Sequence, residues 1–135
     1  MSIKISIIEE LNLFLTVVDG KADDQIASRY QESILSLPGY RPTLNTLMDA
    51  RLVTDNTMSP ENLVRLSTST PFDQSVKRAY VVDNEKAAML ATIFGTTSSG
   101  NENYFVTFNI DDACEWFGFS FEDIKNSSAY KDNLK

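Results

Sequence analysis

Short apolar segments alternate with amphipathic helical segments along this 135-residue chain, and that alternation is the strongest constraint on its fold. Five segments have the composition and period of strands: 3–7, 13–18, 43–51, 76–82 and 104–108. Residues suited to helix N-termini stand between or after them: Asp23 or Asp24, Ser59, Asn84, and Asn109 or Asp111. Strands that alternate with helices favour a parallel sheet with right-handed crossovers. The sequence therefore predicts an α/β fold with a mixed, mostly parallel five-stranded sheet in the order β-β-α-β-α-β-α-β-α.

The length fits one domain, and no linker divides the chain. We expect residues 1–118 to form this domain and residues 119–135 to be a C-terminal extension, partly frayed at its end. The glycine at position 95 is expected to end the third helix as a C-cap.

Charge and composition exclude several classes of function. The net charge of −7 opposes binding to phosphate backbones, so we expect no nucleic-acid partner. No apolar run reaches the roughly 20 residues of a membrane helix, so no membrane insertion is expected. The first residues lack the pattern of a signal peptide, and the single cysteine excludes an internal disulfide. These features predict a cytoplasmic protein.

The chain contains no histidine, which excludes Ser-His and Cys-His catalytic pairs and removes the usual nitrogen ligand of zinc. Phosphate-binding glycine motifs are also absent. We therefore expect no enzyme activity, no cofactor and no metal site. The lone Cys114 stands beside acids, which oppose thiolate formation, and is expected to be a small core residue.

Asp49 and Arg51 are the main candidates for a binding site, because they follow a predicted buried strand. Ligands of α/β sheets meet the carboxyl ends of strands. The alternative is a structural ion pair between the two side chains. Ser59 is a further candidate, with a plain helix N-cap as its alternative. The acid pairs Asp23-Asp24 and Asp111-Asp112 are expected to serve helix N-termini.

Several stretches together resemble the SpoIIAA-like small bacterial domains of the STAS/SEC14 type. The stretches are 18–20, 37–40, 47–51, 59–63, 78–82 and 108–117. The resemblance covers residues 3–118, and it implies a mixed sheet with helices mainly on one face and a non-catalytic domain.

STAS-type regulators dock a partner kinase and are switched by phosphorylation of a serine just after the strand-ending aspartate. Asp49 matches that aspartate, but Arg51 stands where the family has serine or threonine. The nearby hydroxyls, and hence the candidate phosphorylation sites, are Thr54, Thr57 and Ser59.

Two hypotheses about function follow. The first is a non-enzymatic STAS-like regulatory or protein-interaction domain that docks a protein partner around Asp49, Arg51 and Ser59. The alternative is a small-molecule or lipid-binding module with an apolar pocket between sheet and helices, which an empty apolar cavity would favour. A homodimer is also expected, because helices on one sheet face would leave the apolar second faces of 13–18 and 104–108 uncovered.

Overall fold

The computed structural model describes residues 2–98 and 103–133, and in this part of the chain five strands form one sheet. The strands are β1 (Ser2–Ile8), β2 (Leu13–Ala22), β3 (Asn45–Asn56), β4 (Arg78–Val81) and β5 (Tyr104–Thr107), which lie side by side in chain order. β1 is antiparallel to β2, and all later neighbours are parallel. The predicted mixed, mostly parallel five-stranded sheet is confirmed.

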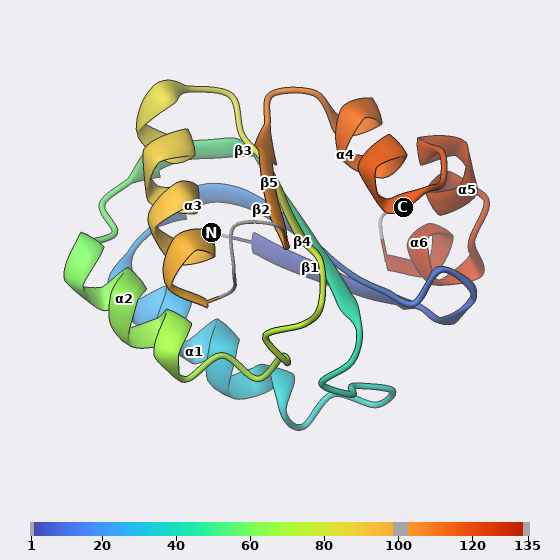
Figure 1. The fold of residues 1–135 in the computed structure, drawn as a ribbon, viewed down its shortest axis with the longest axis horizontal. Coiled ribbons are helices and arrows are strands. Elements are labelled where there is room, and N and C mark those ends of the chain that lie inside the picture. Colours follow the sequence, from blue (N-terminus) through green and yellow to red (C-terminus); the bar gives the residue numbers. More distant parts are fainter. Residues whose placement is uncertain (1, 99–102, 134–135) are drawn as a thin grey trace.

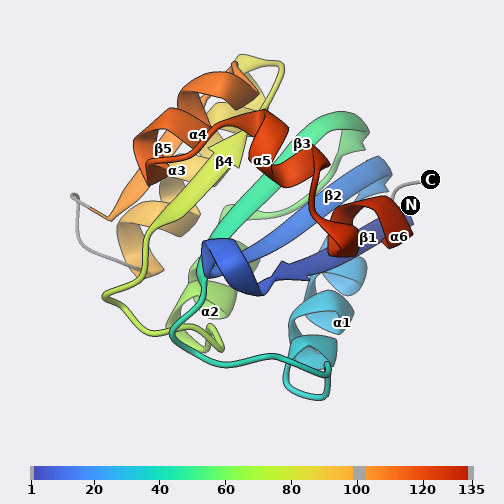
Figure 2. The ribbon, with the colours of Figure 1, turned by 90° about the vertical axis from the view of Figure 1, so that its right-hand side faces the viewer.

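Three helices connect the parallel strands: α1 (Asp24–Ile34), α2 (Pro60–Thr68) and α3 (Glu85–Ser98). A short 3-10 helix, η1 (Glu9–Leu11), joins β1 to β2. The strand order never reverses, so right-handed crossovers place α1, α2 and α3 on one face of the sheet. The chain then crosses to the other face, where α4 (Ile110–Phe117), α5 (Phe121–Lys125) and α6 (Ser128–Asn133) lie (Figures 1 and 2).

The expectation that helices would lie mainly on one face is therefore wrong. The physical reason is that β2 is buried on both sides: Phe14 faces the α1 side, while Leu13 and Leu15 face the α4 side. Both sheet faces need an apolar cover, and the segment after β5 supplies the second one.

The C-terminal segment, expected as a partly frayed extension, contains α5 and α6 within its described part. The side chain of Ile124 is completely buried against the sheet-side core. The Ser6 hydroxyl of β1 donates to the Ala129 carbonyl at 3.3 Å, which links α6 to the edge of the sheet. α5 and the first part of α6 thus pack against the rest of the domain, and positions 134 and 135 lie outside the described residues.

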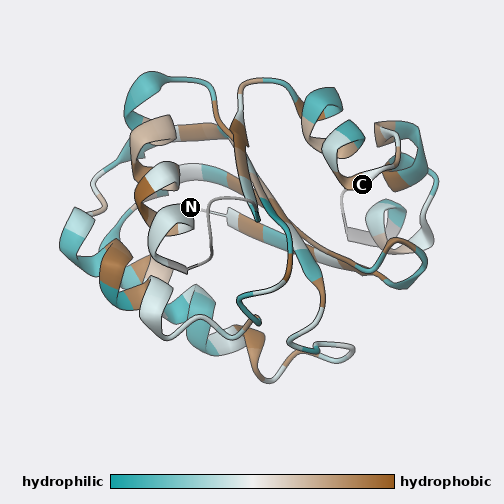
Figure 3. Ribbon diagram, viewed as in Figure 1, coloured by the Kyte–Doolittle hydropathy of each residue, from teal (hydrophilic) through white to brown (hydrophobic). Residues whose placement is uncertain are grey.

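The sheet separates two apolar clusters. The cluster on the α1 side contains Phe14, Ile34, Leu44, Phe72 and Val76. The larger cluster on the α4 side is formed by buried residues of the strands and of the C-terminal helices: Ile8, Leu13, Leu15, Leu47, Ala79, Val81, Ile110, Ala113, Cys114 and Ile124. Hydrophobic residues follow the strands and the helix sides that face them, while the outer helix sides are largely hydrophilic (Figure 3).

The predicted helix starts are confirmed by their caps. The side chains of Asp23, Ser59 and Asn109 accept hydrogen bonds from the first turns of α1, α2 and α4. The third helix, in contrast, continues through Gly95 to Ser98, so the expected C-cap is wrong. Gly95 is instead a close-approach position, since a Cβ atom there would lie 2.6 Å from Cδ2 of Tyr104.

Candidate functional site

β3 bends because two residues are inserted in it relative to its partner β2. One extra residue lies between Asp49 and Leu52, and another lies between Val53 and Asp55. Such β-bulges bend a strand and increase its twist. The far ends of β2 and β3 accordingly curve toward the side of the sheet that carries α1, α2 and α3 (Figure 1).

An apolar pocket of ≈ 160 Å³ lies between this part of the sheet and the three helices. The lining positions of β3 are Met48, Ala50, Val53 and Asn56, spaced by two and then twice by three. A strand normally repeats every two residues, and each spacing of three spans one of the bulges. The bulges therefore keep successive β3 side chains directed to the pocket side.

The other lining residues come from six further elements and their ends: β1, β2, β4, α1, α2 and α3. They are Ile3 and Tyr80 with Val82; Val18 with Ala22; Asp23, Ala27, Tyr30 and Gln31; Met58, Leu63 and Leu66; and Ala87, Leu90, Ala91 and Phe94.

Small side chains keep the pocket open. Five alanines line it from four elements: Ala22 on β2, Ala27 on α1, Ala50 on β3, and Ala87 and Ala91 on α3. An apolar cavity of about 150 Å³ in another protein stays dry and binds benzene, so this one is large enough for a molecule of similar size. Flexible thioether side chains, here those of Met48 and Met58, adapt to irregular shapes.

The polar groups of the lining are few and largely paired within the protein. The hydroxyls of Tyr30 and Thr16 hydrogen-bond at 2.6 Å, and burial raises the pKa of Tyr30 to about 12. The Gln31 amide Nε2 donates to the carbonyls of Leu66 and Ser69 at 3.1 and 3.2 Å. These bonds hold α1 to β2 and to the end of α2, and they leave the middle of the pocket apolar.

Ser59 is the N-cap of α2 and is bound to α1. Its amide and hydroxyl donate to the Asp24 carboxylate at 2.8 and 2.9 Å, and its hydroxyl oxygen accepts from the Asn62 amide at 3.2 Å. The backbone hydrogen bond from Ser59 is the main cause that lowers the pKa of Asp24. A phosphate on this hydroxyl would meet the Asp24 carboxylate, so the geometry opposes phosphorylation of Ser59. Of the other candidate hydroxyls, Thr54 is an exposed residue of β3 and Thr57 lies just after it.

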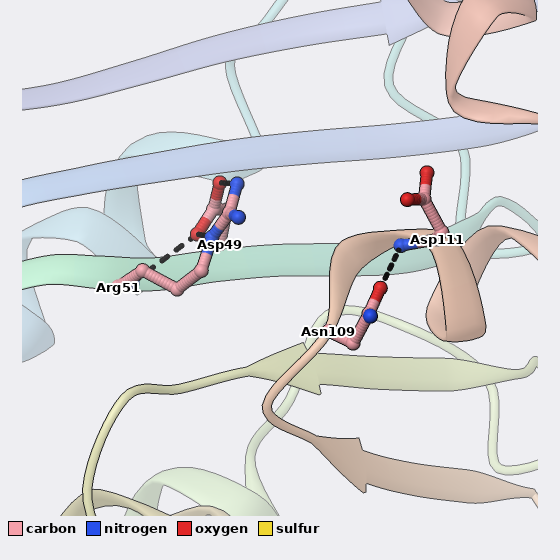
Figure 4. Close-up of polar contacts among 4 residues, drawn as sticks. All are labelled: Asp49, Arg51, Asn109 and Asp111. Atoms are coloured by element: carbon pink, nitrogen blue, oxygen red, sulfur yellow. Dashed lines mark hydrogen bonds and ion pairs between the residues drawn. The ribbon is translucent and has the colours of Figure 1, made fainter.

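Asp49 and Arg51 lie on the opposite sheet face and bind each other. Nε and Nη2 of Arg51 donate to the two carboxylate oxygens of Asp49 at 2.9 and 2.8 Å (Figure 4). The Arg51 amide also donates to Oδ1 of Asp49, at 3.2 Å. The hydrogen bond with Asp49 raises the pKa of Arg51, and the charge of Asp111 at the start of α4 adds to this effect. Asn109 caps α4 beside them by accepting from the Asp111 amide at 2.8 Å (Figure 4).

The geometry thus brings together two of the three predicted site residues. Asp49 and Arg51 form the bidentate ion pair that was the alternative to a binding role, and Lys4 and Asp19 line a hollow of ≈ 270 Å³ beside them. Among the described residues, no hydrogen bond or ion pair joins Ser59 to either of them.

Cys114 lies in the core, as predicted, without exposed surface. Burial raises the pKa of its thiol to about 11, with nearby Asp111 and Asp123 acting in the same direction. Within residues 2–98 and 103–133, no group of three or more acidic or cysteine side chains is placed to hold a metal ion. In the same ranges, no helix is long and apolar enough to cross a membrane.

Comparison with models of known protein families, with curated proteins and with solved structures finds no match to this chain. The resemblance to SpoIIAA-like and STAS domains therefore stays a prediction.

The pocket was anticipated only as an alternative, and its residues were not identified from the sequence. The signal that was present is the run of small residues in the third helix, where Ala87, Ala88 and Ala91 predicted close packing. Ala88 does not line the pocket, whereas Ala87 and Ala91 do. The positions on β3 carried no signal, because a bulge has no fixed residue pattern.

Proposed function

We propose that this chain is a binding module for a small apolar molecule, which it holds in the pocket between the sheet and α1, α2 and α3. The observation that carries the proposal is the nearly all-apolar pocket of ≈ 160 Å³ that the bulged β3 helps to form. The pocket is partly open to solvent, and a ligand that fills it would bury apolar side chains that otherwise border water. Concave apolar sites with a few polar groups are typical of small-molecule binding.

The docking hypothesis receives less support from the geometry. Asp49 uses both of its carboxylate oxygens on Arg51, and the Ser59 hydroxyl is engaged by Asp24. The homodimer prediction has lost its original reason, since α4 to α6 cover the second sheet face within the same chain. A regulatory role, a protein partner and a homodimer stay predictions.

The proposal is tested by methyl NMR with toluene as an uncharged apolar probe. We expect toluene to shift the methyl signals of Met48, Met58 and Leu66, which line the pocket. The methyl signals of Leu47 and Ile124, in the cluster on the far side of the sheet, should stay in place.

Two variants of one helix provide the matched control. Ala91→Leu extends a lining residue into the pocket and should abolish the toluene shifts, whereas Ala88→Leu on the same helix should retain them. Toluene shifts that are absent in the unmodified protein, or that are equal in the two variants, would contradict the proposal.

A further inference from the structure

The pocket has one polar end, at the tip of the β2–β3 ribbon. Ala22 of β2 is the register partner of Asn56 of β3, and the Thr57 amide donates to the Ala22 carbonyl at 2.9 Å. Asp23 follows Ala22 directly, so Asp23 and Asn56 end neighbouring strands, and both line the pocket. A donor-bearing and an acceptor-bearing side chain therefore stand next to each other at this end of an otherwise apolar space.

In each of these two side chains, one of the two polar atoms is hydrogen-bonded within the protein. Oδ1 of Asp23 caps α1 by accepting from the Ile26 amide at 2.9 Å, and Oδ1 of Asn56 accepts from the Met58 amide at 3.1 Å. The second bond fixes the orientation of the Asn56 amide, because an N–H donor must meet the oxygen. Within the described part of the chain, neither Oδ2 of Asp23 nor Nδ2 of Asn56 has a hydrogen-bond partner. One acceptor and one donor thus remain free for a ligand.

The charges around this end oppose an anionic group. Asp23 is the one charged residue among the described lining residues, and no lysine or arginine is among them. Asp24 adds a second carboxylate next in the chain, and its hydrogen bonds from Ser59 lower its pKa and keep it ionised. Two cations are recorded near this end: the exposed Lys86, whose Nζ donates to the Asn56 carbonyl at 2.8 Å, and Arg65, whose charge interacts with Asp24. An anion here would lose its hydration and face the Asp23 charge without a cationic partner in the lining.

We infer that the ligand is an uncharged molecule with an apolar body and one group, such as an amide, that donates a hydrogen bond to Asp23 and accepts one from Asn56. The inference rests on the proposed binding function and specifies its ligand class. Free carboxylates such as those of fatty acids fall outside this class. The size of the space, compared with cavities that hold benzene, limits the buried body to about six to twelve non-hydrogen atoms.

Benzamide and benzoate test this inference, because they have the same shape and differ in charge and in the N–H donor. We expect benzamide to bind the unmodified protein at least tenfold more tightly than benzoate, with the pocket methyl signals as the readout. Asp23→Asn removes the charge and retains an N-cap residue, so it should reduce this ratio at least threefold. Asn56→Asp keeps the Oδ1 acceptor but removes the donor, so it should weaken benzamide at least threefold.

The two proposals fail in different ways. Equal affinities for benzamide and benzoate, or a ratio that Asp23→Asn leaves unchanged, would overturn the ligand class. If toluene still shifts the pocket signals in that case, the binding function itself stands. If neither toluene nor benzamide shifts these signals, the binding function fails, and the ligand class fails with it.

Discussion

Filling the pocket from within should stabilise the protein, and Ala91→Leu is the change that tests this most directly. Ala91 lies on α3, lines the pocket and is half-buried. At about 24 cal/mol per Å³ of enclosed cavity, ≈ 160 Å³ would correspond to about 4 kcal/mol of lost packing, and this value is an upper bound because the pocket is partly open to solvent. Leucine adds only part of the missing volume. Its additional carbon atoms, at about 0.8 kcal/mol for each buried methylene, amount to about 2 kcal/mol.

The expected result is an increase of about 1–2 kcal/mol in the free energy of unfolding, because some strain from the new side chain will offset the gain. Urea denaturation measures it as a higher midpoint at an unchanged slope. Ala88→Leu is the control, since Ala88 lies on the same helix and does not line the pocket. Alanine and leucine differ by only a few tenths of a kcal/mol in helix propensity, so the control should change little.

One result would refute the reasoning. If Ala91→Leu and Ala88→Leu had the same stability, the space beside Ala91 would already be filled in solution. A loss of stability in Ala91→Leu, with native methyl signals elsewhere, would likewise mean that no room exists for the added atoms. In either case the calculated gain has no basis, and the case for a ligand loses its main observation.

Three further predictions concern the rest of the fold. Gly95→Ala should lower the free energy of unfolding by about 1–3 kcal/mol, although this change inside a helix normally stabilises, because the new Cβ would lie 2.6 Å from Cδ2 of Tyr104. In a Tyr104→Ala background, denaturation should show a smaller loss from Gly95→Ala, because only the Cβ of residue 104, at 3.1 Å, remains close to the new atom. Arg51→Ala should lower the free energy of unfolding by about 1–2 kcal/mol in urea denaturation, because it leaves the Asp49 carboxylate without its bidentate partner on a side chain that is 12% exposed. The Arg51 side chain is 37% exposed, which limits the effect, and a variant as stable as the parent would contradict this prediction. Cys114 should not react with a thiol reagent at pH 8 until the protein unfolds, because its thiol is buried and its pKa is raised to about 11. Deprotonation favours the unfolded chain, so the contribution of the buried thiol to stability is complete below the pKa of the unfolded state and is lost as the pH rises toward 11. Rapid labelling of the native protein would refute the buried placement of Cys114.

Local signals in the sequence were sufficient for the sheet and for most helix starts. Ser59 before a proline, and Asn109 before two acids, are residues whose side chains can meet free amides, and both caps are present. The third helix shows the limit of such signals. Glycine is typical of a C-cap, but at position 95 glycine is needed because Tyr104 packs too closely for a Cβ atom. Gly95 and Tyr104 belong to different elements, and no local sequence pattern shows that the two elements come this close.

Local sequence patterns also could not predict which face of the sheet the last helices cover. The apolar character of 13–18 on both sides indicates that both sheet faces need a cover, and the sequence predicts a second copy of the chain as its source. The actual cover comes from α4, α5 and α6. A sequence pattern shows that a face must be buried, but it does not show which segment buries it.

The candidate site was hidden by two physical effects that act at the same place. Two bulges change the spacing of lining positions on β3 from two to three, and Val53 and Asn56 lie beyond the predicted strand 43–51. At the end of the same ribbon, Asp23 has a structural role as the N-cap of α1. A carboxylate, however, has two oxygen atoms, and the cap uses only Oδ1. Assigning a structural role to a side chain therefore does not exclude a binding role for its remaining atom, and the choice between them depends on whether that atom borders an empty space.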